Sequence, residues 1–139
     1  MEDNLFKWNF EKNEENFIYD TLKKLAESLR VQSDGIFEPL VTIADISDNS
    51  RTYGFYIKVP ELSGFTWRIF EINTKTTTRY SEIIFPSTVD GSKTYRVSSK
   101  QDLIESINRI INEKEIINEM SMYFNRVIIK RKQQEDFKE

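Results

Sequence analysis

Two glutamates are the residues of this sequence that could most readily take part in acid–base chemistry or metal binding. Glu71 and Glu82 lie on two predicted strands joined by a short hairpin, so one register of that hairpin places them opposite each other. Two facing carboxylates can share a proton or hold Mg²⁺. A register shift of one residue instead sends them to opposite faces of the sheet. Because Arg68, Lys75 and Arg79 are close in the sequence, we prefer the interpretation that both glutamates form ordinary surface ion pairs.

A second metal-binding candidate is the turn that contains Asp45, Asp48 and Asn49. Its oxygen-rich composition resembles a calcium-binding loop. The spacing of an EF-hand, its glycine and its final glutamate are all missing. We therefore expect no metal site at this turn.

The composition excludes most of the familiar catalytic machinery. The chain of 139 residues contains no cysteine and no histidine. This excludes cysteine nucleophiles, Cys/His zinc sites and every mechanism that uses histidine as a base. With only 4 glycines, the sequence has no P-loop and no dinucleotide-binding glycine motif. We expect no cofactor and no enzymatic activity; a carboxylate- or cation-dependent enzyme is the remaining catalytic alternative.

Basic residues gather at the end of the last predicted helix, namely Arg126, Lys130, Arg131 and Lys132. The helix dipole favours positive charge at a helix C-terminus, which explains the cluster without any ligand. Phosphate binding and contact with a protein partner are the alternatives, although the acidic residues after position 134 weaken the local field. The net charge of -3 gives no overall attraction to nucleic acid or to a membrane.

The middle strands are predicted to carry large apolar side chains on both faces of the sheet. Over 64–73, Phe65, Trp67 and Ile69 alternate with Phe70 and Ile72. A sheet that is covered on one face only should alternate clearly between apolar and polar residues. Either the helices and the N-terminal arm cover both faces, or one face exposes aromatic and basic residues of the kind found at protein interfaces. The candidate partner-binding residues are Tyr56, Arg68, Phe70, Arg79 and Arg96.

The elements that position these residues follow from periodicity. Apolar residues at three- and four-residue steps predict a helix over 13–31, with Asn13 as its N-cap and Ser33-Asp34-Gly35 as its end. Before it, aromatic residues at positions 6, 8 and 10 predict a short edge strand or arm packed on its own domain. Docking of this arm on a partner or a second copy is the alternative.

A period of two and regular turn signals predict strands near 40–46, 52–59, 64–73, 78–86 and 93–97. The connections are too short for crossover helices, so neighbouring strands should pair antiparallel as a meander.

The final segment is predicted to be helical, with Ser99 and Asp102 as a capping arrangement. One helix over 100–131 would be about 48 Å long, which exceeds the roughly 30 Å diameter of such a domain. We therefore favour a break near 112–114. Phe124, Val127 and Ile128 should be buried, either in the core or against a second subunit, and residues 133–139 should form a flexible tail.

The sequence as a whole predicts an α+β fold: an N-terminal helix, an antiparallel meander of about five strands, and a long or broken C-terminal helix packed on the sheet. Residues 1–132 form the single domain, in which 1–12 are the arm or edge strand. The acidic N-terminus and the short apolar runs predict a cytoplasmic protein with no membrane contact.

For function, we expect a non-catalytic protein-binding module of the immunity, chaperone or adaptor type, with another protein as its partner and homodimerisation as a further option. A nucleic-acid-associated regulator and a small-molecule or lipid-binding domain are the alternatives.

Overall fold

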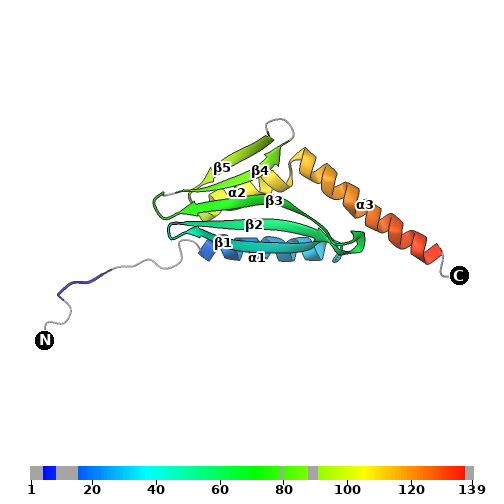
Figure 1. Ribbon diagram of the computed structural model, residues 1–139, viewed down its shortest axis with the longest axis horizontal. Helices are drawn as coiled ribbons and strands as arrows, with labels where there is room; N and C mark the ends of the chain where they lie inside the picture. The colour runs from blue at the N-terminus through cyan, green and yellow to red at the C-terminus, as the bar shows by residue number, and fades with distance from the viewer. Residues whose placement is uncertain (1–4, 9–15, 79, 88–90, 137–139) are drawn as a thin grey trace.

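The fold is a five-stranded antiparallel sheet with helices at both ends of the chain, as shown by a computed structural model (Figure 1) that describes residues 5–8, 16–78, 80–87 and 91–136. The elements are α1 (Asn16–Gln32), β1 (Glu38–Ser47), β2 (Ser50–Val59), the short 3-10 helix η1 (Pro60–Leu62), β3 (Phe65–Lys75), β4 (Ser81–Ser87), β5 (Gly91–Val97), α2 (Lys100–Ile111) and α3 (Lys114–Asp136). The strand order β1-β2-β3-β4-β5 is a meander. The predicted α+β class and all five predicted strands are thereby confirmed.

Helix α1 forms because its apolar residues return to one side at every turn. Ile18, Leu22 and Ala26, each four residues apart, are all buried against the sheet. The helix ends where Asp34 and Gly35 adopt positive φ angles of 51° and 76°, and the Gly35 N–H donates to the Arg30 carbonyl at 2.9 Å. This left-handed ending is favoured by glycine. The predicted cap at Asn13 lies outside the described residues.

A β-bulge in β3 decides which side chains enter the core. Phe55 of β2 is opposite Phe70, whereas the next residue, Tyr56, is opposite Arg68, so Ile69 is an extra residue in β3. One extra residue reverses the alternation of faces beyond it. Trp67 before the bulge and Phe70 after it therefore point to the same face. The prediction that β3 presents apolar residues on both faces was wrong for this reason.

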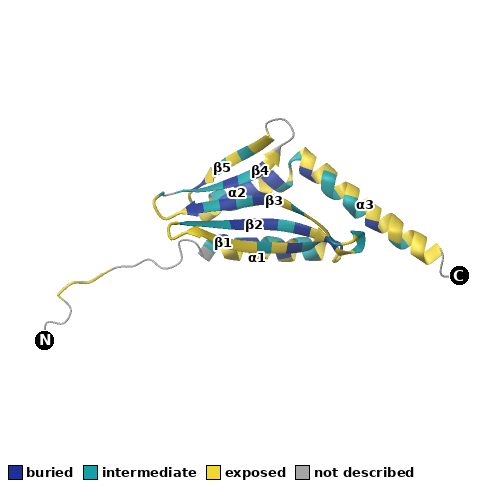
Figure 2. Cartoon of the chain, in the orientation of Figure 1, coloured by how far each residue is buried: buried dark blue, intermediate teal, exposed yellow. Residues whose placement is uncertain are grey.

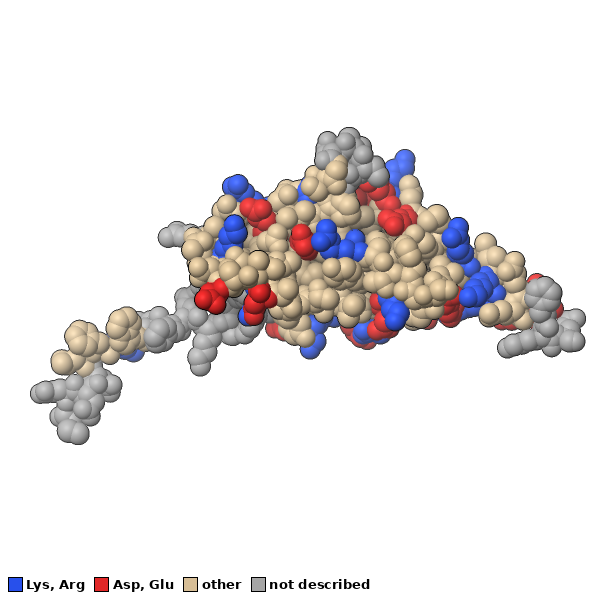
Figure 3. All heavy atoms as spheres, in the orientation of Figure 1, with Lys and Arg blue, Asp and Glu red and all other residues tan. Residues whose placement is uncertain are grey.

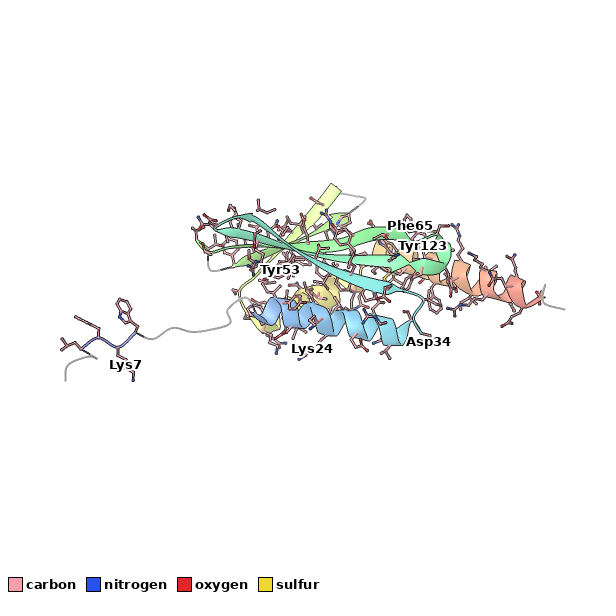
Figure 4. The ribbon with its side chains drawn as sticks, turned by 60° about the horizontal axis from the view of Figure 1, so that its bottom comes forward. Lys7, Lys24, Asp34, Tyr53, Phe65 and Tyr123 are labelled. Carbon is pink, nitrogen blue, oxygen red and sulfur yellow. The ribbon has the colours of Figure 1, made fainter. Side chains whose placement is uncertain are left out.

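All three α-helices cover the same face of the sheet. Figure 4 shows α1 and α2 below the sheet. Helix α3 lies on the same side, because its Tyr123 ring packs 5.0 Å from the ring of Trp67, which is opposite the buried Ile57. The core lies between these layers, and Figure 2 shows the buried positions concentrated in β2, β3 and β4. Its largest fully buried side chains include Tyr53, Phe55, Phe70, Phe85, Leu22 and Leu103. No described element covers the opposite face of the sheet.

Helix α2 begins with the predicted cap. The Ser99 hydroxyl accepts a hydrogen bond from the Asp102 N–H at 3.1 Å. The Asp102 carboxylate in turn accepts from the Ser98 N–H at 3.4 Å and from the Ser98 hydroxyl at 3.1 Å. In a capping box, a glutamate at this position would accept a hydrogen bond from the backbone N–H of the N-cap residue, here Ser99. The shorter aspartate side chain bonds Ser98 instead.

The predicted break in the C-terminal helix is confirmed at Asn112 and Glu113, between α2 and α3. Beyond the break, Val127 is fully buried and the half-buried Phe124 ring lies 6.2 Å from the Phe37 ring. Ile128 remains 40% exposed in the single chain, so it is not a core residue, and its burial against a second subunit stays a prediction. Helix α3 continues through Asp136, and residues 137–139 lie outside the described part of the chain.

The described part of the N-terminal arm, residues 5–8, forms no strand. Leu5, Phe6 and Trp8 are 75%, 78% and 76% exposed. The predicted edge strand is therefore not present in these residues, and positions 9–12 lie outside the description. Among the helices that the structure describes, none is long and apolar enough to cross a membrane.

Candidate functional site: the open face of the sheet

The face of the sheet opposite the helices is the candidate site, and we call it the open face. It includes the following side chains, which alternate with the buried ones or, for Tyr80, contact one that does: Leu40, Thr42, Tyr56, Arg68, Glu71, Tyr80, Glu82, Ile84, Thr94 and Arg96. The strand register aligns them in rows, because Tyr56 is opposite both Leu40 and Arg68, and Ile84 is opposite both Glu71 and Thr94. Figure 3 shows this side of the molecule as mostly uncharged surface with interspersed acidic and basic groups.

Tyr56 lies against the backbone of its own strand at Gly54. A Cβ atom at Gly54 would lie 2.7 Å from Cε1 of Tyr56 and 2.6 Å from Oγ1 of Thr42. Both distances are closer than nonbonded atoms approach, so position 54 has room only for glycine while the ring and the hydroxyl stay in place. The missing side chain therefore allows the Tyr56 ring to lie flat on the open face, half-buried rather than extended into solvent.

Arg96 is held by an aromatic ring at the β4–β5 end of the open face. Its guanidinium carbon lies 4.6 Å from the centre of the Tyr80 ring, which is a cation–π contact. In the register of the two strands, Arg96 is opposite Glu82. The side chain remains exposed, so its planar donor group is oriented without being removed from solvent.

Arg68 and Glu71 form an ion pair on the open face, with 3.0 Å between Nη1 and Oε2. In a regular strand, residues three apart point to opposite faces. The bulge at Ile69 brings this pair to the same face. Because each side chain already has an oppositely charged partner, neither presents an unbalanced charge to a phosphate or a metal ion.

The carboxylate sites suggested by the sequence are not formed. Glu71 is opposite Ile84, and Glu82 is opposite Asn73, so the two glutamates do not face each other. The Asp45 carboxylate accepts a hydrogen bond from Nε of Arg51 at 2.7 Å, and this bond raises the pKa of Arg51. Within the described ranges, no group of three or more acidic side chains is arranged to hold a metal ion.

The structure places the five predicted partner-binding residues in different environments. Tyr56, Arg68 and Arg96 lie on the open face. Phe70 does not: it is 0% exposed and stacks on Phe55 at 5.3 Å, so it is a core residue that cannot touch a partner in the folded protein. Arg79 lies outside the described residues.

Several residues of the open face were absent from our partner-binding candidates, and the large apolar or aromatic ones among them are Leu40, Tyr80 and Ile84. The period of two places Tyr80 and Ile84 on one face, and that signal is visible in the sequence. For Leu40, the signal is its position between Pro39 and Val41, whose side chains point to the helix side.

Part of the basic cluster in α3 has a structural role. Arg131 donates to both carboxylate oxygens of Glu61, at 2.7 and 2.9 Å, and Nζ of Lys130 donates to the Glu61 carbonyl at 2.6 Å. The hydrogen bond from Arg131 lowers the pKa of the Glu61 carboxyl. These contacts attach α3 to η1. They support a structural role for the basic cluster of α3 over phosphate binding.

A hollow of about 560 Å³ lies where the start of α1 meets the end of the sheet, and Phe17, Thr74, Tyr80 and Val97 help to line it. Ligand sites usually combine an apolar cavity with a few convergent polar groups. In the described part of the chain, every buried polar side-chain atom already has a hydrogen-bond partner. No buried polar group in this region is therefore left to orient a small molecule.

No protein-family model, curated protein or solved structure matches this chain. The geometry of the open face is therefore the basis for inferring what the protein binds.

Proposed function

We propose that this chain is a non-catalytic protein-binding module and that the open face is its binding surface. The observation that carries the proposal is the one-sided placement of the helices, which leaves a five-stranded face uncovered in the described structure. Aromatic and arginine side chains are the commonest anchors of protein interfaces. Tyr56 and Arg96 are both held in place on this face, so less conformational entropy is lost when a partner binds.

The chemistry of the open face favours a protein partner over nucleic acid. Its arginines are accompanied by Glu71 and Glu82, which would repel phosphates. The face is also an open sheet rather than a concave pocket, which favours another macromolecular surface over a small molecule. The matching partner presents an apolar patch for Leu40, Tyr56 and Ile84, surrounded by charges of both signs.

An immunity, chaperone or adaptor role is consistent with this chemistry, since each depends on binding one protein surface. A second copy of the chain is a further candidate for that partner. Sedimentation of the purified protein at several concentrations distinguishes the two, because only self-association changes the sedimenting mass with concentration.

The proposal is tested by site-specific photo-crosslinking. A photoreactive residue replaces Thr94 on the open face or, as the control, Lys24 on the exposed side of α1 (Figure 4). Each protein is irradiated in a lysate of its source organism. We expect a discrete partner to be captured at position 94 and not at position 24.

The captured protein is then purified and its affinity is measured by calorimetry. Arg96→Glu should weaken binding by about tenfold or more, because an arginine anchor of an interface contributes about 1–2 kcal/mol or more. Lys24→Glu makes the same charge change on the other side and should leave the affinity unchanged. Equal affinities for the wild type and Arg96→Glu would refute the assignment of the open face.

A further inference from the structure

Strand β1 forms an edge of the sheet that is open to solvent. Among the described strands it is first in the order and pairs only with β2 (Figure 1). It is ten residues long, whereas strands most often have about five or six. Its side chains Leu40, Ile43 and Ile46 are 51%, 48% and 69% exposed. A long, apolar edge of this kind is a template for another strand, because its outer backbone groups have no partner in the sheet.

The backbone groups that face the free edge belong to alternate residues of β1, namely Pro39, Val41, Ile43 and Asp45. The Arg51 carbonyl of β2 accepts a hydrogen bond from the Thr74 hydroxyl of β3 at 3.2 Å, so it points away from β1. Asp45 is opposite Arg51 and therefore directs its own N–H and C=O outward. Residues at two-residue steps from Asp45 do the same. Pro39 agrees with this assignment, since an edge proline is tolerated where its nitrogen faces solvent.

Charge distinguishes this edge from the opposite edge of the sheet. The other edge strand, β5, carries Lys93 and Arg96, and charged side chains on an edge strand oppose pairing with another chain. β1 contains no lysine or arginine. Its two carboxylates, Glu38 and Asp45, each form an ion pair with an arginine of the same chain. The stretch 39–44 between them is uncharged, so β1 lacks the protection that β5 has.

We propose that β1 pairs antiparallel with β1 of a second copy, about a two-fold axis at Thr42. Opposing residues of an antiparallel pair lie on the same face, so the two five-stranded sheets become continuous. The uninterrupted register of β1 ends at Asp45, where a bulge begins. A pair centred on Thr42 uses only the regular residues 39–45.

The strand is complementary to itself in this register. Val41 lies opposite Ile43 of the second copy, Leu40 lies opposite its Ala44, and the two Thr42 residues face each other. Pairs of β-branched side chains and of threonines stabilise a sheet, and no carboxylate of β1 faces another. Because the same contacts occur twice about the axis, one chain supplies both halves of the interface.

The architecture leaves room for this pairing and limits it to two chains. Figure 4 shows α1 below the sheet rather than beside β1. The pairing uses the β1 edge of both copies, and the outer edges of the dimer are then the charged β5 strands. Both open faces stay uncovered and lie on the same side of the joined sheet. The inference is therefore independent of the proposed protein-binding function.

A single cysteine tests the contact directly, because the chain contains none. Thr42 directs its backbone groups to β2, so the two Thr42 residues form a non-hydrogen-bonded pair with Cα atoms about 4.5 Å apart. This separation is within the usual range of a disulfide. Under mild oxidation, Thr42→Cys should form a linked dimer at least about tenfold faster than Thr94→Cys, which is exposed on β5, because pairing raises the local thiol concentration. Equal rates would overturn the proposal.

Two lysine variants locate the interface by sedimentation. The wild type should sediment with twice the mass of one chain. Ile43→Lys places a charge on the pairing edge of both copies and should give the mass of one chain. Thr94→Lys adds the same charge on the open face and should leave the dimer intact. A single-chain mass for the wild type would refute the pairing, and the reverse pattern of the variants would refute it by assigning self-association to the open face.

Amide hydrogen exchange tests the register. The Val41 N–H faces the free edge, so it should be protected in the wild-type dimer and should exchange rapidly in Ile43→Lys. The Thr42 N–H faces β2 and should be protected in both proteins, which also confirms that the variant is folded. Equal exchange of the Val41 amide in the two folded proteins would contradict the proposal.

Discussion

Replacing Phe70 with alanine tests the β-bulge that organises this fold. The Phe70 side chain is fully buried, and its ring stacks on Phe55 with an interplanar angle of 6°. Burying such a side chain contributes about 1.5–3 kcal/mol, and the cavity left by truncation raises the total loss to about 3–5 kcal/mol. This is a large share of the roughly 5–15 kcal/mol by which a domain is stable.

The free energy of unfolding is measured by urea titration followed by circular dichroism. Thr94→Ala, on the open face, is the matched control and should change the stability by no more than about 0.5 kcal/mol, as exposed substitutions generally do. The two variants should unfold with the same denaturant slope, since a changed slope would indicate a changed unfolded or native ensemble.

A loss below about 1 kcal/mol for Phe70→Ala would place Phe70 on the solvent side, as its position in the sequence suggests. The bulge would then be absent. Deletion of Ile69 gives an independent test, because removal of the extra residue closes the bulge and leaves every other residue of β3 on its present face, opposite its present partner in β2. We expect the deletion variant to fold, with its stability lowered by the loss of the buried Ile69 side chain. A variant that cannot fold would refute the register, because in a strand without a bulge the deletion turns the side chains on one side of position 69 to the wrong face.

Three further predictions concern single contacts. Gly54→Ala should lower the free energy of unfolding by about 1–3 kcal/mol through overpacking. Adding Thr42→Ala should recover part of that loss in urea titrations, because it removes the atom nearest the new methyl group, and no recovery would contradict the close approach. Ser99→Ala should cost about 1 kcal/mol through loss of the N-cap, while Ser99→Asp should be almost neutral; equal losses in thermal melts would exclude a capping role. Because Arg131 lowers the pKa of Glu61 in the folded state, the ion pair should stabilise the protein at neutral pH and lose this effect as the pH falls below 4.5 toward the lowered pKa. Glu61→Gln should therefore lower the urea midpoint of unfolding slightly at neutral pH and leave it unchanged in acid. A change of equal size at both pH values would show that the charge of Glu61 is not involved.

The sequence predicts most of the candidate site, but it does not predict correctly every residue that belongs to the open face. Tyr56, Arg68 and Arg96 lie on the open face as the alternation of their strands predicts. Phe70 was assigned to that face by the same alternation and is instead in the core. The rule failed because it assumes an uninterrupted strand, and the interruption at Ile69 is visible only when β2 and β3 are paired.

The sequence by itself determined the order and type of the elements, because those depend on local forces. The turn at Asp34-Gly35, the cap at Ser99 and the break after Ile111 each involve neighbouring residues, so their signals lie within a few positions. Pairing partners and layers depend instead on contacts between distant residues. Only the tertiary structure decided that all the helices cover one face and that the extra residue in β3 turns Phe70 inward, because both outcomes follow from burying the largest apolar area in a single core.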